Sequence, residues 1–281
     1  MAGSPALTRT GIRPGPACVW CERAATCGAY PAARTVPTNA RTLNLTKTDI
    51  EGMDRCHRRV AWRRVHGIPR DDGEEADLSQ AVSQGRMFHR LVQMAELADD
   101  QAAAVVDFLR GVAPSEAADL AVMWDKHREL MESEGLTARM TEFPVGLTLL
   151  EGERSQMVGA TLIAFVDMTA RSGDGQPVAV EIKSGSAAET AVEDDLYAVG
   201  MRRWIGEDVP VVIHRHFIGW SRPECETITV QPDEIEAAVQ RLAGRVATAY
   251  GWDWEDPLQP AYTLGPWCGG CEFRTTCESY R

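Results

Sequence analysis

The segment from Ile163 to Gly185 constrains the fold of this chain more than any other, because it has the pattern of a β-hairpin. An apolar run with β-branched residues extends to Thr169, and a polar turn that contains glycine covers residues 171–176. Pro177 then opens a second apolar run, VAVEI. Two such runs joined by a turn predict a pair of antiparallel strands.

Three ionisable side chains interrupt these strands: Asp167 in the first, and Glu181 and Lys183 in the second. Because Glu181 and Lys183 are two residues apart, they point to the same face of a strand. Asp167 can reach that face across the turn. Charged groups are costly to bury unless they are paired or bind a metal ion. Two carboxylates and a lysine that converge on one spot would suit a divalent cation and a phosphate group.

The composition is that of an ordinary globular protein, with 44% hydrophobic and 25% charged residues among 281. The sequence has neither an apolar run of about 18 residues nor a basic-then-apolar leader, so we expect a cytoplasmic protein without a membrane span. The net charge of −12 argues against a general nucleic-acid coat protein. It is compatible with an enzyme that has a local basic groove.

The eight cysteines indicate metal or cluster ligands rather than disulfides in a chain without an export signal. Six of them form two triplets with the same C-x2-C-x5-C spacing. The first triplet is Cys18, Cys21 and Cys27, and the second is Cys268, Cys271 and Cys277. Cys56 and Cys225 stand apart from both triplets.

Residues 1–42, rich in Pro, Ala, Gly, Arg and Thr, are interpreted as an irregular arm that only the first cysteine triplet organises. Zinc and iron–sulfur sites are normally four-coordinate, so three thiols need a further ligand. Cys225, His66, His57 or a residue elsewhere could supply it, for Zn²⁺ or for a second cluster. The alternative is an arm whose thiols are free.

The remaining pattern alternates between helices and strands. A capping box at residues 48–51 predicts one helix through Gly67, and it carries six basic or imidazole side chains: Arg55, His57, Arg58, Arg59, Arg63 and Arg64. Such a patch is either a solvated face or a phosphate contact. Further helices are expected at 78–97, 100–111, 115–133 and 189–205 and after Asp233, with strands within 141–170 and 209–230.

Four histidines in these elements bear on the function. His89 shares a helix face with Gly85, and a glycine inside a helix indicates close packing there. A lone histidine is more often structural than catalytic, and His127 is expected at the boundary of a helical core. His214 and His216 fall on one face of a strand, where an exposed polar face is favoured over a metal-binding pair.

Taken in order, these motifs resemble a known family. The chain has CHRRVAW, then G-x-x-x-H on a helix, an Asp on one strand, E-x-K on the next, a helix with EDDLY, and finally WCGGCEFRTTC. This order resembles the RecB-like branch of the PD-(D/E)XK nucleases, in particular the iron–sulfur exonucleases typified by the small CRISPR-associated member and the AddB nuclease domain. The resemblance covers about residues 43–281. It implies an α/β, restriction-endonuclease-like core with a mixed central β-sheet flanked by helices.

The resemblance implies a metal-dependent DNA nuclease, an exonuclease that acts on single-stranded ends. The catalytic Mg²⁺ or Mn²⁺ would be held by His89, Asp167 and Glu181 together with the carbonyl of Ile182. Carboxylate and carbonyl oxygens suit hard cations, and a histidine ligand shifts the preference towards manganese. Lys183 would orient or help to deprotonate the attacking water and stabilise charge on the scissile phosphate.

Further residues are implied to position the substrate. Tyr197 resembles a family tyrosine that positions the site and touches DNA. Glu193 stands where the family has glutamine, which adds negative charge near the metal. Contacts to DNA are expected from Arg58, Arg59, Arg63 and Glu193.

The resemblance also divides the cysteines. Cys56 with Cys268, Cys271 and Cys277 would bind one [4Fe-4S] cluster that joins the N- and C-terminal parts, with zinc in the same thiolates as the competitor. Partners in repair, recombination, phage replication or CRISPR adaptation are compatible with such an enzyme. Two other functions remain open: a catalytically impaired nucleic-acid-binding or assembly subunit that keeps the fold and cluster, and a zinc-stabilised interaction module.

Overall fold

The computed structural model describes residues 42–70, 80–150, 159–184, 191–205, 208–219 and 222–279. The predicted N-terminal arm, with Cys18, Cys21 and Cys27, lies outside these residues. Within the described ranges, every helix is too short or too polar to cross a membrane.

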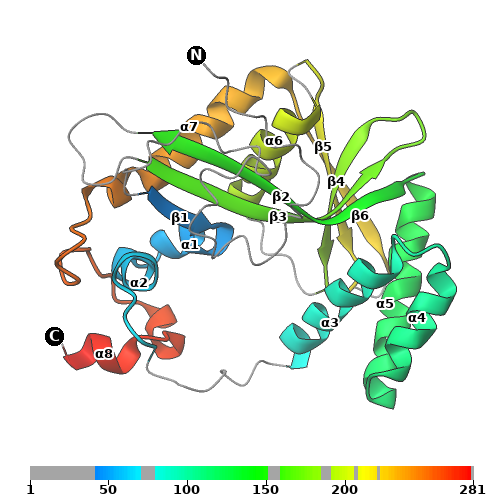
Figure 1. Cartoon of the computed structure of the whole chain (residues 1–281), viewed down its shortest axis with the longest axis horizontal. Coiled ribbons are helices and arrows are strands. Elements are labelled where there is room, and N and C mark those ends of the chain that lie inside the picture. The colour runs from blue at the N-terminus through cyan, green and yellow to red at the C-terminus, as the bar shows by residue number, and fades with distance from the viewer. Residues whose placement is uncertain are drawn as a thin grey trace, which may run out of the picture. The chain divides into compact units, whose positions relative to one another are not determined.

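The described strands form a mixed sheet, as the fold prediction requires (Figure 1). The strands are β1 (Thr42–Thr46), β2 (Thr137–Leu150), β3 (Gly159–Arg171), β4 (Pro177–Lys183), β5 (Val211–Phe217) and β6 (Glu224–Val230). Their order is β1-β3-β4-β5-β6, and β2 also pairs with β3. The pairs β1–β3 and β4–β5 are parallel, whereas β3–β4 and β5–β6 are antiparallel.

Most helices lie close to their predicted positions, but the helix expected from residue 48 to 67 is divided and the C-terminal helix was not predicted. The helices are α1 (Lys47–Met53), α2 (His57–Ala61), α3 (Gln80–Ala95), α4 (Gln101–Arg110), α5 (Pro114–Ser133), α6 (Ala191–Ile205), α7 (Ile235–Val246) and α8 (Arg274–Ser279). Shorter turns of 3₁₀-helix lie at Pro232–Glu234, Ala247–Gly251 and Pro266–Gly270, and one π-helical turn lies at Trp62–His66. The 3₁₀ turn at Pro232–Glu234 directly precedes α7, and its N-cap is Gln231. The residue that caps this part of the chain is therefore Gln231 and not Asp233, after which the helix was expected.

The chain divides into two compact units. The described residues of the first unit fall within 1–73, 144–164 and 236–281, and those of the second within 74–143 and 165–235. The long strands β2 and β3 each run from one unit into the other.

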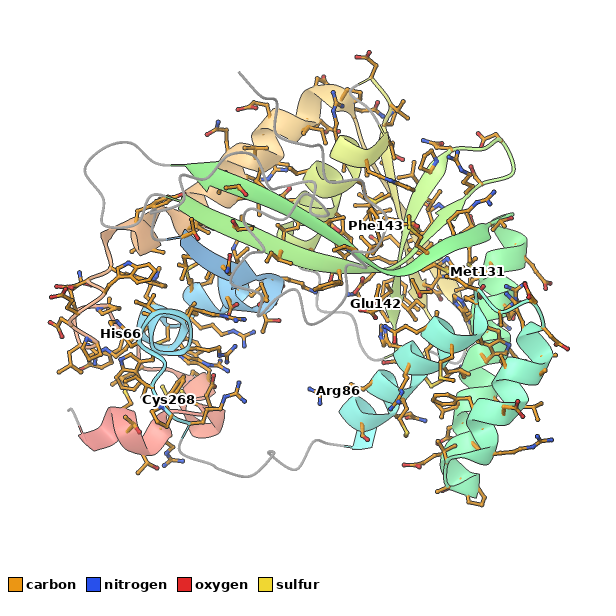
Figure 2. All side chains as sticks on the ribbon, in the orientation of Figure 1. His66, Arg86, Met131, Glu142, Phe143 and Cys268 are labelled. Carbon is orange, nitrogen blue, oxygen red and sulfur yellow. The ribbon has the colours of Figure 1, made fainter. Side chains whose placement is uncertain are left out.

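The second unit has a core in which α3 and α5 cover one face of β3, β4 and β5. Phe88 and Leu91 of α3 and Met131 of α5 are buried against Val180 and Ile182 of β4 (Met131 is labelled in Figure 2). Helix α6 packs on β4 and β5. Because Arg215 of β5 bonds to Asp194 of α6 and the next residue lies against α5, the two helices cover opposite faces of the sheet.

In the first unit, the helix predicted from residue 48 to 67 is wrong in two respects. Thr46 rather than Thr48 caps α1: the Thr46 hydroxyl accepts from the Asp49 N–H at 3.3 Å, and the Asp49 carboxylate accepts from the Thr46 N–H at 2.8 Å. The helix also stops at Met53, because Cys56 has an extended backbone and becomes the N-cap of α2. Strand β1, which ends at Thr46, was not predicted.

The C-terminal segment is held on α2 by contacts that account for much of the basic patch. Arg58 is buried and donates to the carbonyls of Leu258 at 2.7 Å and Pro260 at 3.0 Å. The Trp62 ring meets Phe273 edge to face, with centroids 5.6 Å apart. Arg59 and Arg63 both pair with Glu272. The guanidinium groups of Arg58, Arg59 and Arg63 are therefore engaged within the first unit.

In the second unit, the residue after α3 carries a buried carboxylate that joins α3 to α5. Glu96 is only 4% exposed, and its Oε1 lies 2.9 Å from Nε2 of His127 and 3.2 Å from Nη1 of Arg128. Burial raises the pKa of Glu96, but the bonds and charges of His127 and Arg128 outweigh burial and hold the pKa below its usual value. His127 is fully buried, so its predicted place at the boundary of the core is wrong.

Replacing Glu96 with alanine is expected to lower the free energy of unfolding by about 3–5 kcal/mol, because it leaves buried partners unpaired. The depressed pKa means that this stabilisation is present at neutral pH and is lost as the pH falls below about 4. Urea unfolding of both proteins across this pH range measures the difference. The control is Glu132→Ala, an exposed partner of the same Arg128, which should change stability by less than about 0.5 kcal/mol.

Candidate active site

The predicted hairpin is confirmed and supplies the central strands of the site. Met168 pairs with Val180 and Arg171 with Pro177 in an antiparallel register. In the turn, the N–H of Gly175 donates to the carbonyl of Ser172 at 2.8 Å, and Gly175 has a φ of 88°, which glycine adopts without strain.

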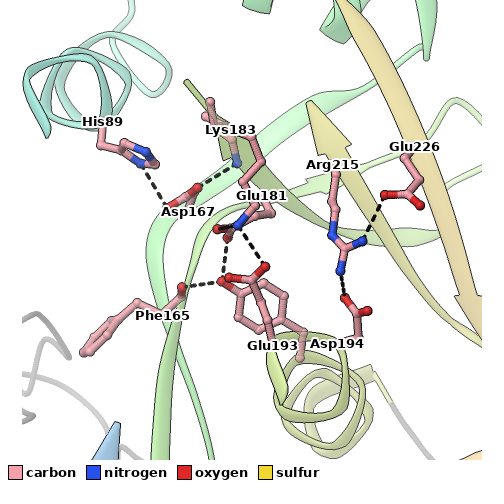
Figure 3. A network of polar contacts seen from close by, with 11 residues as sticks. His89, Phe165, Asp167, Glu181, Lys183, Glu193, Asp194, Arg215 and Glu226 are labelled. Atoms are coloured by element: carbon pink, nitrogen blue, oxygen red, sulfur yellow. Dashed lines mark hydrogen bonds and ion pairs between the residues drawn. The ribbon is translucent and has the colours of Figure 1, made fainter. Parts of the chain in front are cut away.

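Asp167 accepts bonds from both sides of the site. Its Oδ2 accepts from the backbone N–H of Ile182 at 2.7 Å, and its Oδ1 lies 3.0 Å from Nδ1 of His89 (Figure 3). Burial lowers the pKa of His89, but the charge and hydrogen bond of Asp167, with the nearby carboxylates, outweigh burial and raise it to about 9. Without a metal, His89 is therefore an imidazolium that is paired with Asp167.

Helix α3 comes close to the end of β4 because Gly85 has no side chain. A Cβ built on Gly85 would lie 2.6 Å from Oγ of Ser184, the residue after Lys183. His89 lies one turn further along the same face of α3. The close packing predicted from this glycine is confirmed, and it brings the imidazole to the hairpin.

Lys183 lies between two carboxylates. Its ammonium donates to Oε1 of Glu181 at 2.7 Å and to Oε2 of Glu193 at 2.8 Å (Figure 3). Burial lowers the pKa of Lys183, but these two carboxylates outweigh burial and raise the pKa above its usual value. Burial, together with the charges of Asp167 and Glu193, raises the pKa of Glu181 despite the contact with Lys183.

Tyr197 of α6 closes the buried end of the site. Its hydroxyl lies 2.9 Å from the carbonyl of Phe165 and 2.5 Å from Oε2 of Glu181. A phenol has one hydrogen to donate. It goes to the carboxylate of Glu181 or to the carbonyl of Phe165, so the phenol holds a residue from each strand of the hairpin.

One acidic residue of the site was not predicted. Glu142 of β2 (labelled in Figure 2) offers a carboxylate oxygen that lies within 4.8 Å of ligand atoms of His89 and Asp167. Its backbone has a φ of 50°, which is uncommon for a residue other than glycine. Burial and the charge of Asp167 raise the pKa of Glu142. The rule that singled out Asp167, an acidic residue inside an apolar strand, applies equally to Glu142.

The donor set fits a hard divalent cation. The ligand atoms of His89, Glu142 and Asp167 lie close to one another, and their side chains are partly exposed, so an ion can reach them. Carboxylate oxygens with one imidazole suit Mg²⁺ and Mn²⁺. Glu181 is turned towards Lys183 and Tyr197.

The cysteines of the predicted cluster all lie in the first unit. Cys56, Cys268, Cys271 and Cys277 are free thiols and half-buried. Burial raises the pKa of Cys271. The nearby Cys56 raises this pKa further, whereas the positive charge of Arg59 lowers it. Cys56 and Cys271 are thus close to the same guanidinium. As free thiols, all four are available as ligands.

On β5, the prediction of an exposed polar face is wrong. His214 is 7% exposed and His216 is 0% exposed. The reason is that α5 covers this face of the sheet: the ring of His127 lies 5.8 Å from that of His216. The spacing of the two histidines correctly predicted that they share one face of the strand. It did not predict that α5 packs on this face.

The sequence matches the family model of the PD-(D/E)XK nuclease superfamily over residues 44–278. Among solved structures, the chain is similar to the protein SSO0001, with 15% sequence identity and a TM-score of 0.37 over 88% of this chain and 89% of that one. It is also similar to a presumed exonuclease from Eubacterium rectale, with 11% identity and a TM-score of 0.48 over 85% and 88% of the two chains. No curated protein matches the sequence.

Replacing Tyr197 with phenylalanine is expected to lower the free energy of unfolding by about 1–3 kcal/mol, because it removes the hydroxyl that bonds to the buried carboxylate of Glu181 and to the carbonyl of Phe165. Urea unfolding measures the change. Tyr262→Phe is the control, since Tyr262 is 44% exposed and its ring stays over Arg58. Equal stabilities of the two variants would contradict the buried bonding of Tyr197.

Proposed function

The chain belongs to the PD-(D/E)XK nuclease superfamily, and from this we propose that it is a metal-dependent deoxyribonuclease that degrades DNA from single-stranded ends. The observation that carries the proposal is the convergence of His89, Asp167, Glu181 and Lys183 at one place in the second unit. The preference for single-stranded ends rests on the motif order shared with the iron–sulfur exonucleases. Roles in repair, recombination, phage replication or CRISPR adaptation would supply such ends.

His89, Asp167 and Glu142 would hold Mg²⁺ or Mn²⁺, with Glu181 and the carbonyl of Ile182 as the family-derived ligands. When bound, the cation polarises the scissile phosphate and lowers the pKa of the attacking water. Glu142 is the one ligand in this proposal that the sequence motifs did not predict.

Lys183 acts as a cation in this proposal rather than as a base. Its two carboxylate partners keep it protonated, so its ammonium can donate to a phosphate oxygen or to the attacking water but cannot accept a proton. Glu193, in the position of the family glutamine, then positions Lys183 by accepting its second bond. From the buried side, Tyr197 positions Glu181 by donating to its Oε2.

The thiols of the first unit fit a [4Fe-4S] cluster or Zn²⁺. We propose the cluster, held by Cys56, Cys268, Cys271 and Cys277, because the spacing and order match the iron–sulfur exonucleases. The N–H of Gly265 already donates to Sγ of Cys268 at 3.4 Å, a contact that would stabilise a thiolate. The role is structural, since the cluster would fasten the C-terminal segment to the start of α2. Arg59 and Arg63 beside it remain proposed DNA contacts, although both already pair with Glu272.

The nuclease proposal predicts that Asp167→Asn and Lys183→Met each reduce Mn²⁺- or Mg²⁺-dependent degradation of end-labelled single-stranded DNA by about 10²-fold or more, because each removes a charge at the reacting phosphate. Chelation should abolish the activity. Circular single-stranded DNA, which has no ends, should survive.

The matched control is Asp174→Asn, an exposed carboxylate in the turn of the same hairpin, which should keep full activity. Full activity of both site variants would overturn the assignment of the site. Degradation of circular DNA at the same rate would overturn the requirement for ends but leave the nuclease.

The cluster proposal predicts about four iron and four sulfide per chain in anaerobically purified protein, with visible absorption. A Cys268→Ser, Cys271→Ser variant should lose both, whereas Cys225→Ser, a half-buried free thiol of the second unit, should keep them. Colourless wild-type protein with zinc in place of iron would contradict the cluster. Iron analysis and absorption spectra measure the outcome.

A further inference from the structure

The β5–β6 pair carries a group of metal-binding side chains that the nuclease chemistry does not use. His216 of β5 is paired in register with Cys225 of β6, so their side chains leave the sheet on the same face, and His214 lies two residues along the same face. One ligand atom from each of these three residues lies within 4.8 Å of the other two. All three belong to the second unit.

The imidazoles of this group lack the hydrogen bonds that buried imidazoles usually make. Both ring nitrogens of His216, and Nδ1 of His214, are buried without a hydrogen-bond partner among the described residues. Buried polar atoms normally have partners, and each one without a partner costs about 1–3 kcal/mol. A pair of histidines in this state needs an explanation, and a metal ion at their common face would satisfy one nitrogen of each.

We propose that His214, His216 and Cys225 form a zinc-binding site that is separate from the active site. The inference does not depend on the proposed nuclease activity. Two imidazoles and a thiol are the donors that zinc prefers, whereas Mg²⁺ and Mn²⁺ prefer oxygen. In a tetrahedral zinc site the ligand atoms lie about 3.3–3.6 Å apart, so the three side chains need to close by only about 1 Å.

The surroundings of the three ligands support a bound cation. Burial and two neighbouring imidazoles lower the pKa of His216 to about 3, so the ring is neutral and has a free lone pair. Burial and the charge of Glu134, exposed at the C-terminal end of α5, raise the pKa of Cys225 to about 11, so the thiol would give up its proton on binding zinc. The carboxylate of Glu134 and the thiolate formed in this way would balance the two charges of zinc. Cys225 is half-buried, which leaves the fourth position to Glu134 or water.

The role of this site is structural. Among the described strands, β6 lies at the end of the strand order and pairs only with β5. A metal ion shared by His216 and Cys225 would fasten this edge strand to β5. The same segment of β5 pairs with the part of β4 that carries the candidate active site, since Arg215 is opposite Glu181 and His216 opposite Ile182. The zinc would therefore stabilise the sheet directly behind Glu181 and Lys183.

The test is the zinc content of the full chain, measured by elemental analysis after gel filtration, in wild type and in a His214→Ala, His216→Ala variant. We expect one zinc fewer per chain in the variant. Zinc at other cysteines contributes equally to both proteins and cancels in the difference. Thr229→Ala, at an exposed position on β6, is the control and should keep the wild-type content.

Cys225→Ser keeps the size of the side chain and decides the matter if the double variant does not fold. Zn²⁺ added to chelator-treated wild type should raise its Tm, and the same addition should leave the Tm of Cys225→Ser unchanged. In cobalt-substituted protein, Cys225→Ser should lose intensity from the thiolate-to-cobalt charge-transfer band. Equal zinc contents and equal Tm shifts in wild type and Cys225→Ser would overturn the proposal.

Discussion

The ion pairs of Lys183 with Glu181 and Glu193 are the interaction on which the candidate site depends. A partly buried ammonium is tolerated only when it is paired, and here its pairing places Glu181 close to Asp167, which itself lies beside Glu142. The site therefore contains more acidic groups than Lys183 and His89 can balance. Burial first, and then the charges of the neighbouring carboxylates, raise the pKa values of Glu181 and Glu142. A divalent cation would offset the same excess, so the electrostatics of the hairpin and the chemistry of metal binding point in one direction.

The position of His89 depends on contacts that residues on either side of it make. Gly85 lets α3 approach Ser184, and at the other end of α3 the carboxylate of Glu96 holds His127 and Arg128 of α5. The helix is thus fastened at both ends, with His89 between them. On a helix fixed in this way, Nδ1 of His89 lies 3.0 Å from Oδ1 of Asp167. The glycine and the buried carboxylate serve the site without touching a substrate.

Local patterns in the sequence were enough to predict the hairpin, most helices and the face shared by Glu181 and Lys183, because strand alternation and helix periodicity are local properties. The break at Cys56 was not predictable in this way: nothing in the helical pattern of residues 48–67 marks the extended backbone of that residue. Glu142 and the burial of His216 depend on which distant element packs on a strand face. The alternation of His214 and His216 is the same whether that face meets water or α5, and only the tertiary structure decides between them.

Strand β5 separates two kinds of chemistry because its side chains alternate. On one face, Arg215 bonds to Asp194 and Glu226. It lies opposite Glu181 of β4, among the carboxylates of the candidate site. On the other face, His214 and His216 meet Cys225 under α5. A hard cation is favoured by the carboxylates, and zinc is favoured by imidazole and thiol. Because the strand itself keeps these donor sets on opposite faces, a zinc ion could stabilise the sheet without competing for the position where a phosphodiester would react.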